Sequence, residues 1–106
     1  MPDPITDPLS QFRLDGKIAL ITGASRGIGA TIAQSYAAVG ATVVLASRKL
    51  EGVEAIATTI RDAGGNAHPY AVHTGDEAAI SALVNATLDR FGTIDILVNN
   101  AATNPH

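Results

Sequence analysis

Cysteine and tryptophan are missing from this chain of 106 residues, and aromatic residues make up only 4% of it. Without cysteine, the chain can form no disulfide, no thiolate metal site and no cysteine nucleophile. The net charge is −3 and the charges are interspersed, so charge-driven binding to nucleic acid or to a membrane surface is not expected. No apolar run approaches the roughly 20 residues that span a bilayer. The three histidines show no metal-ligand spacing, and we expect no metal site.

What remains is a profile typical of one small globular domain, with 46% hydrophobic residues and ten glycines. Residues 1–16 begin with three prolines among acidic residues and are predicted to form an irregular arm. This end shows no positively charged segment followed by an apolar one, the pattern of a secretory leader. We therefore expect a cytoplasmic protein.

From Lys17 onward, short apolar runs alternate with helical periodicity. The runs predict four strands, at 17–22, 42–46, 67–72 and 94–100. Pro69 cannot donate to a sheet ladder, which predicts an edge position for the third strand. Helices are predicted between the strands, and Asp76 is the expected N-cap of the third. In the first helix, the apolar residues Ile28, Ile32, Tyr36 and Val39 recur at helical spacing. The third helix is predicted to bury Ile80, Leu83, Val84 and Leu88.

This alternation predicts an α/β fold with a doubly wound parallel sheet of the Rossmann type. Right-handed crossovers restrict the topology. In the Rossmann arrangement the fourth strand would start on the other side of the first, which gives the strand order 3-2-1-4. We expect residues 17–106 to be a dinucleotide-binding domain that is incomplete, because the chain stops soon after the fourth strand.

Three glycines follow the first strand in the stretch "ITGASRGIG". Their spacing, Gly23, Gly27 and Gly29, is neither G-x-G-x-x-G nor a P-loop. Glycine permits positive φ and close approach of a ligand, and the following helix would aim its free N–H groups at an anion. A pyrophosphate would fit there, with hydroxyl contacts from Thr22 and Ser25. The alternative is a tight connection without a ligand.

"TGASRGIG", followed about 70 residues later by "DILVNNAA", resembles the short-chain dehydrogenase/reductase family, with its T-G-x-x-x-G-x-G and N-N-A-G motifs. The resemblance covers nearly everything from Phe12 onward. It implies hydride transfer between a nicotinamide coenzyme and an alcohol or carbonyl substrate, in an enzyme that we expect to be a homo-oligomer. It also assigns the pyrophosphate contacts to Thr22, Gly23, Ser25, Arg26, Ile28 and Gly29, with Gly27 keeping the turn tight.

The end of the second strand bears on the choice between NAD and NADP. Ser47 stands where an NAD-dependent member would carry Asp, and Arg48 and Lys49 follow it. These residues, with Arg26, suit a 2′-phosphate, and cations at a helix start are otherwise unfavourable. The pattern therefore favours NADP over NAD, although Arg48 and Lys49 can also be read as simply solvated.

Two further segments are expected near the coenzyme. His73 and Thr74 replace the family's Asp-hydrophobic pair at the adenine, and His73 fits an adenine contact and an ordinary loop position equally well. Asn99, Asn100 and Ala101 match N-N-A-G and are expected to line the pocket by resemblance, with Ala102 in place of the final Gly. For Asn100 a structural role at the strand end fits better than for Asn99.

The family's proton-transfer residues, a Ser and a Tyr-x-x-x-Lys, are not in this sequence, and we assign no catalytic residue. Tyr36 and Tyr70 are the only tyrosines, and four residues later stand Gly40 and Thr74. The 106 residues alone are predicted to be inactive. Three interpretations stay open: the coenzyme-binding part of an NADP-dependent oxidoreductase, a nucleotide-binding module without catalysis, or an assembly fragment that binds no nucleotide.

Overall fold

The fold alternates strand and helix throughout, as the sequence predicts. The computed structural model describes residues 13–73 and 75–100. The elements along the chain are β1 (Ile18–Thr22), α1 (Gly27–Ala38), β2 (Thr42–Ser47), α2 (Leu50–Asp62), β3 (Asn66–Ala71), α3 (Glu77–Phe91) and β4 (Ile96–Asn99).

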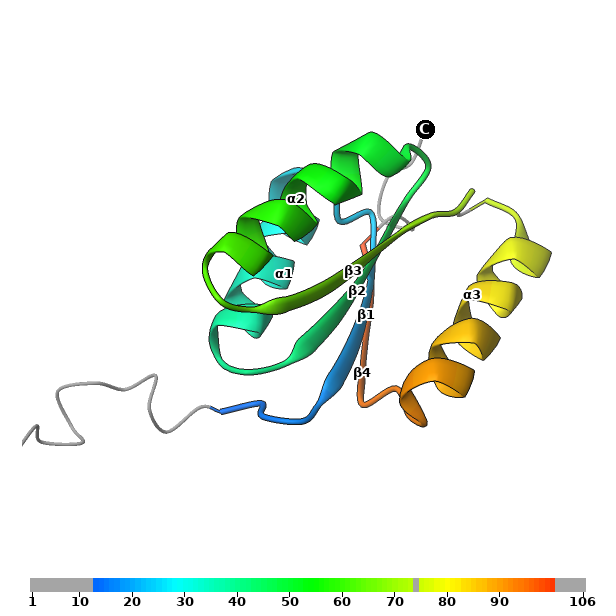
Figure 1. The fold of residues 1–106 in the computed structure, drawn as a ribbon. Helices are drawn as coiled ribbons and strands as arrows, with labels where there is room; N and C mark the ends of the chain where they lie inside the picture. The colour runs from blue at the N-terminus through cyan, green and yellow to red at the C-terminus, as the bar shows by residue number, and fades with distance from the viewer. Residues whose placement is uncertain (1–12, 74, 101–106) are drawn as a thin grey trace, which may run out of the picture.

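The four strands form one parallel sheet in the order β3-β2-β1-β4. In its centre, Leu20 of β1 lies opposite Val44 of β2 and Leu97 of β4. Helices α1 and α2 cover one face of the sheet and α3 covers the other (Figure 1). The predicted strand order and double winding are confirmed, and β3 with its Pro69 lies at an edge.

The core has two layers because alternate residues of a strand point to opposite faces. Ile21 and Leu45 belong to the cluster beneath α1 and α2. Leu20 and Val44 belong to the cluster beneath α3, together with Leu83. All five residues of β1 are buried, which explains why this strand reads as a continuous apolar run.

The fully buried residues of α1 are smaller than the apolar residues that its spacing singled out. Its buried residues are Gly29, Ala30, Ala33 and Ala37. Ile28 is 70% exposed, while Ile32 and Tyr36 are partly buried and pack against the core. Small side chains allow the helix backbone to lie close to the sheet, so the larger ones are left at the margins.

The end of α3 shows a similar exchange. Leu88 is 40% exposed, whereas Thr87 is buried at 1%. The Thr87 hydroxyl donates to the carbonyl of Leu83 over 2.8 Å. That hydrogen bond within the helix lets a polar residue take a core position.

The fourth strand is shorter than predicted, with Ile96–Asn99 in place of 94–100. Asp95 precedes it and holds the start of β1: its carboxylate accepts from the amide of Ile18 over 2.8 Å, and its own amide donates to the Ile18 carbonyl over 2.9 Å. Ile94 packs against the α3 cluster.

Residues 1–12 of the predicted arm lie outside the described residues. The rest of that segment, residues 13–16, forms neither helix nor strand and includes a turn. Its Leu14 packs partly against the larger core cluster. Over the described ranges, no helix is both long enough and apolar enough to cross a membrane.

Candidate functional site

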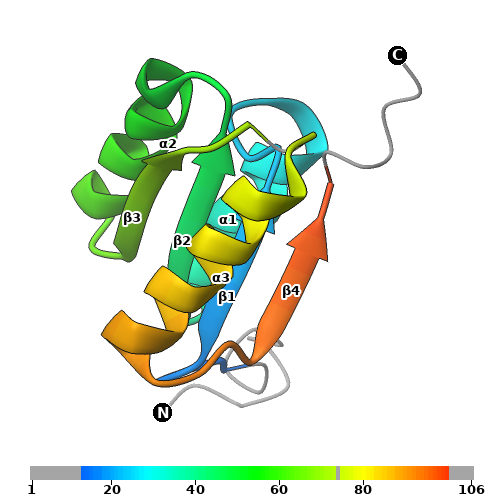
Figure 2. The same cartoon turned by 90° about the vertical axis from the view of Figure 1, so that its right-hand side faces the viewer.

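The predicted site residues gather where the parallel strands end. Helices α1 and α2 begin close to the ends of β1 and β2, at the edge toward which the strand arrows point (Figure 2). Ligands of open α/β sheets bind at the carboxyl ends of the strands, where the strand order reverses. Here that reversal lies between β1 and β4.

The glycine turn is built around two positive φ angles and one close approach. Gly23 and Gly27 have φ of 64° and 62°, a region that side chains with a Cβ rarely adopt. A Cβ at Gly29 would collide with the carbonyl oxygen of Gly23. The Asn100 side-chain amide donates to that same oxygen over 3.2 Å. The turn is therefore held against both the helix start and the end of β4.

The three helix N-termini differ in how they are capped. The Asp76 carboxylate caps α3 and accepts from the amides of Ala78 and Ala79, at 2.9 and 3.3 Å, as predicted. Arg26 and Lys49, the N-caps of α1 and α2, are extended and make no side-chain capping hydrogen bond. The first N–H groups of a helix have no acceptor inside it. At α1 and α2, no N-cap side chain supplies one.

Two serine hydroxyls join the turn to the second strand. Ser47 at the end of β2 donates to Ser25 in the glycine turn over 3.2 Å, and both residues are half-buried. Helix α2 closes over this pair. A Cβ at Gly52 would lie 2.8 Å from the Ser25 Cβ, so glycine permits this approach. Sequence reasoning missed Gly52, although a glycine near a helix start was a signal for it.

The surroundings of these hydroxyls carry positive charge. Arg26, Arg48 and Lys49 are exposed, and none of them forms an ion pair with a carboxylate of the described residues, where Arg13–Asp15 is the ion pair found. Glu51 is the acidic residue in the first turn of α2. Cations that lack a carboxylate partner beside hydroxyl donors suit an anionic group such as phosphate.

The fold brings Thr22 and Asn99 together, and their side chains form a hydrogen bond that joins two strands. Thr22 is buried at 4%, and its hydroxyl donates to the Asn99 side-chain oxygen over 3.0 Å. This bond ties the end of β1 to the end of β4. Asn100 also has a structural contact, through the Gly23 carbonyl.

The remaining predicted site residues are either exposed or outside the described residues. His73 is exposed, and its Nδ1 accepts from the amide of Gly75 over 3.3 Å, so this nitrogen has a backbone partner. Thr74 and Ala101 lie outside the described residues. Ile28 stands at the start of α1 with its side chain largely in solvent. Within 13–73 and 75–100, no group of three His, Asp or Glu could hold a metal ion.

A parallel sheet in this order, with a glycine turn leading into a helix, defines a nucleotide-binding α/β domain of the Rossmann class. A family model described as short chain dehydrogenase matches residues 17–106. The chain belongs to this family.

Several known proteins are similar to the chain. It is 46% identical over 90 residues to D-threitol dehydrogenase of Mycolicibacterium smegmatis, covering 85% of this chain and 35% of that protein. It is 50% identical over 91 residues to sorbitol dehydrogenase of Cereibacter sphaeroides, covering 86% and 34%. The chain thus spans about a third of the length of these curated relatives.

Solved structures of the family resemble the fold closely. A hydroxysteroid dehydrogenase from Escherichia coli matches with a TM-score of 0.79 and 39% identity, over 82% of this chain and 37% of that one. A metagenomic short-chain oxidoreductase in complex with NADP matches with a TM-score of 0.78 and 42% identity, over 79% and 38%.

Proposed function

We propose that this chain forms the coenzyme-binding part of an NADP(H)-dependent oxidoreductase that acts on an alcohol or carbonyl substrate. The observation that carries the proposal is the Ser47–Ser25 hydrogen bond, set among Arg26, Arg48 and Lys49 beside the glycine turn. The solved relative in complex with NADP supports the choice of coenzyme. The cytoplasmic location stays a prediction from the sequence.

The residues present fit a dinucleotide phosphate. Gly23 has a positive φ, and a Cβ at Gly29 would collide with the Gly23 carbonyl oxygen. The backbone of this turn would take the pyrophosphate together with the N–H groups at the start of α1. The serine hydroxyls and cations at the start of α2 would take the 2′-phosphate, which carries roughly −1.5 to −2 charges. When bound, a nicotinamide coenzyme supplies or accepts the hydride.

Other predicted contacts extend this proposal. We assign Asn99 and Ala101 to the coenzyme pocket and His73, with Thr74, to the adenine side. None of these residues is a proton donor for catalysis. Tyr70 accepts a hydrogen bond from Arg90 over 3.3 Å, and Tyr36 packs against the core. We therefore expect these 106 residues to bind the coenzyme without turning over a substrate.

Direct titration of the chain with NADPH tests the proposal. Wild-type protein should bind NADPH, and Arg48→Ala should weaken binding about 10- to 100-fold, because hydrogen bonds to charged groups contribute about 1.5–3 kcal/mol. The matched control is Lys17→Ala, which removes an exposed cation just before β1, at the opposite end of the sheet. This variant should bind like wild type in isothermal titration calorimetry.

Absence of NADPH binding by folded wild-type chain would contradict the proposal and favour the assembly-fragment interpretation. If Arg48→Ala and Lys17→Ala lose the same NADPH affinity, the loss reflects the net charge of the chain and not a contact of Arg48 with the phosphate. A second assay adds a polypeptide that carries the Ser and the Tyr-x-x-x-Lys. Carbonyl reduction that appears only after this addition would favour the enzyme over a nucleotide-binding module without catalysis.

A further inference from the structure

The loop that follows β3 brings an imidazole next to the candidate phosphate site. The amide of Val72 donates to the Ser47 carbonyl over 2.8 Å, so the chain leaves β3 beside the Ser47–Ser25 pair. His73 follows one Cα–Cα step of about 3.8 Å further on, and its side chain is exposed. The order β3-β2-β1 thus sets the glycine turn, the serine pair and this loop side by side.

The chemistry of a 2′-phosphorylated nucleotide places its base on this side. The base is attached to the ribose carbon next to the one that carries the 2′-phosphate. With the pyrophosphate at the glycine turn and the 2′-phosphate at Ser47, the nucleotide runs from β1 toward β3. The base is then within reach of His73.

The ring of His73 is held by the backbone of its own loop. Its Nδ1 accepts from the Gly75 amide over 3.3 Å, and the Asp76 amide donates to the His73 carbonyl over 3.0 Å. A Cβ at Gly75 would lie 3.2 Å from Cε1 of the ring, so glycine lets the ring lie close to the backbone. Asp76 is also the N-cap of α3. The imidazole is therefore anchored to the start of a helix.

The hydrogen bond at Nδ1 determines what the other ring nitrogen can do. A nitrogen that accepts from an N–H group carries no proton, so the proton of this ring is on Nε2. Nε2 is then a donor, and the ring has no second acceptor for a ligand. Purine bases differ in this respect at position 6. The 6-amino group of adenine is a donor, whereas a 6-oxo group is an acceptor.

We propose that His73 is a specificity-determining residue of the base subsite and that it removes the selection for the 6-amino group of adenine. Its Nε2–H donates to O6 of a 6-oxo purine, while with adenine it is restricted to a ring nitrogen. A dinucleotide with hypoxanthine in place of adenine should therefore bind at least as tightly as NADPH. This inference rests on the proposed function, because it takes the 2′-phosphate to be held at Ser47.

The test compares NADPH with its deaminated analogue, reduced nicotinamide hypoxanthine dinucleotide phosphate, by calorimetric titration of the chain. The two share their phosphates, riboses and nicotinamide, so the ratio of their Kd values reports on the base alone. Wild type should bind the analogue as tightly as NADPH or more tightly. In His73→Asp the ratio should shift about tenfold or more toward NADPH, because a carboxylate accepts from the 6-amino group and repels O6.

Two controls separate the hydrogen bond from the added charge. Ser81→Asp introduces the same charge at an exposed position of α3, and it should leave the ratio at its wild-type value. Nitrogen NMR of the free chain observes the ring directly and should find the His73 proton on Nε2.

The outcomes that overturn the inference differ from those that overturn the proposed function. A wild-type chain that binds NADPH more tightly than the analogue would overturn the inference alone, as would a proton on Nδ1. An equal shift of the ratio in Ser81→Asp and His73→Asp would also overturn it. A folded chain that binds neither dinucleotide would contradict the proposed function and this inference together.

Discussion

At the residue scale, the contact between Gly52 and Ser25 sets the shape of the candidate phosphate site. A Cβ at position 52 would lie 2.8 Å from the Ser25 Cβ and 3.6 Å from its hydroxyl oxygen. That hydroxyl accepts the hydrogen bond from Ser47. The depth at which α2 lies on the glycine turn thus determines where both hydroxyls point.

We predict that Gly52→Ala weakens NADPH binding about tenfold, the loss that corresponds to one misplaced hydrogen bond of roughly 1.4 kcal/mol. Alanine is the better helix former by about 0.8–1.0 kcal/mol, so the folded state should not be lost. Calorimetric titration measures the effect.

The double variant gives the control. Removing the opposing Cβ with Ser25→Gly should leave Gly52→Ala with less than about a twofold effect, because contacting residues couple in a mutant cycle. Independent, additive effects would show that the contact does not position Ser25.

Some residue roles could be predicted from the sequence and others could not. The glycine turn is local, so Gly23, Gly27 and Gly29 were found from their spacing. The Ser25–Gly52 contact and the Thr22–Asn99 hydrogen bond join segments 27 and 77 residues apart in the sequence. No local pattern specifies which side chains meet after such folding.

At the scale of elements, β3 carries a titratable contact with α3. His68 lies against Phe91 with ring centroids 5.1 Å apart and an interplanar angle of 58°. Burial lowers the pKa of His68 from its usual value of 6.5, and the nearby Arg90 and Arg61 charges lower it further. The neutral imidazole is therefore the form that the folded state favours.

We predict that stability falls as the pH drops below about 6.5. In that range the unfolded chain binds a proton that the folded chain resists, so the free energy of unfolding rises with pH until both forms are neutral. His68→Phe keeps a ring against Phe91 and should flatten this part of a Tm-against-pH profile. A profile that keeps its slope in His68→Phe would contradict the assignment.

The two edges of the described sheet differ in their protection. Pro69 removes one donor from β3, whereas β4 offers an apolar strand whose Leu97 is 62% exposed. An unprotected edge strand is a template for association. We predict that the isolated chain self-associates through residues 94–98.

Sedimentation velocity over a concentration series measures this association. Leu97→Lys should shift the protein toward monomer, because a charged side chain opposes edge pairing. Leu50→Lys, at a position 43% exposed on α2, should not. A wild-type chain that stays a monodisperse monomer at high concentration would refute the prediction.

Element boundaries followed from the sequence wherever burial was complete. Strands β1 and β2 are buried on both faces and read as apolar runs. The apolar face of α1 was predicted only in part: Ile32 and Tyr36 pack against the core, but Ile28 is 70% exposed. The close approach of α1 to the sheet instead selects Ala30, Ala33 and Ala37. Helix spacing alone carries no information on that distance.

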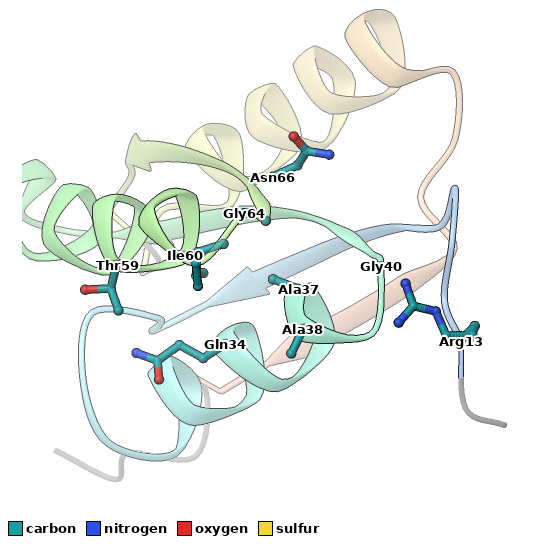
Figure 3. Close-up of a pocket in the computed structure, with 11 residues that line it drawn as sticks. Arg13, Gln34, Ala37, Ala38, Gly40, Thr59, Ile60, Gly64 and Asn66 are labelled. Carbon is teal, nitrogen blue, oxygen red and sulfur yellow. The ribbon is translucent and has the colours of Figure 1, made fainter. Parts of the chain in front are cut away.

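At the scale of the whole molecule, the two ends of the sheet carry different features. The carboxyl ends of the strands gather the glycine turn, the serine pair and the cations that suit a phosphorylated coenzyme. The other end holds a groove of about 400 Å³ between the ends of α1 and α2 (Figure 3). The fold follows from the sequence, and the coenzyme site that we propose lies at the strand ends that the sequence indicates.

The most direct test of this account is the ratio of the Kd values for NADH and NADPH, measured by calorimetry in wild-type chain and in Ser47→Asp. Wild type should favour NADPH by about tenfold or more, since charge-assisted contacts to the 2′-phosphate contribute over 1.4 kcal/mol. Ser47→Asp should reverse the preference, because its carboxylate repels the phosphate and accepts from the ribose hydroxyls. The uncharged Ser47→Asn should not reverse it. An identical ratio in wild type and Ser47→Asp would contradict the assignment of the 2′-phosphate to this site.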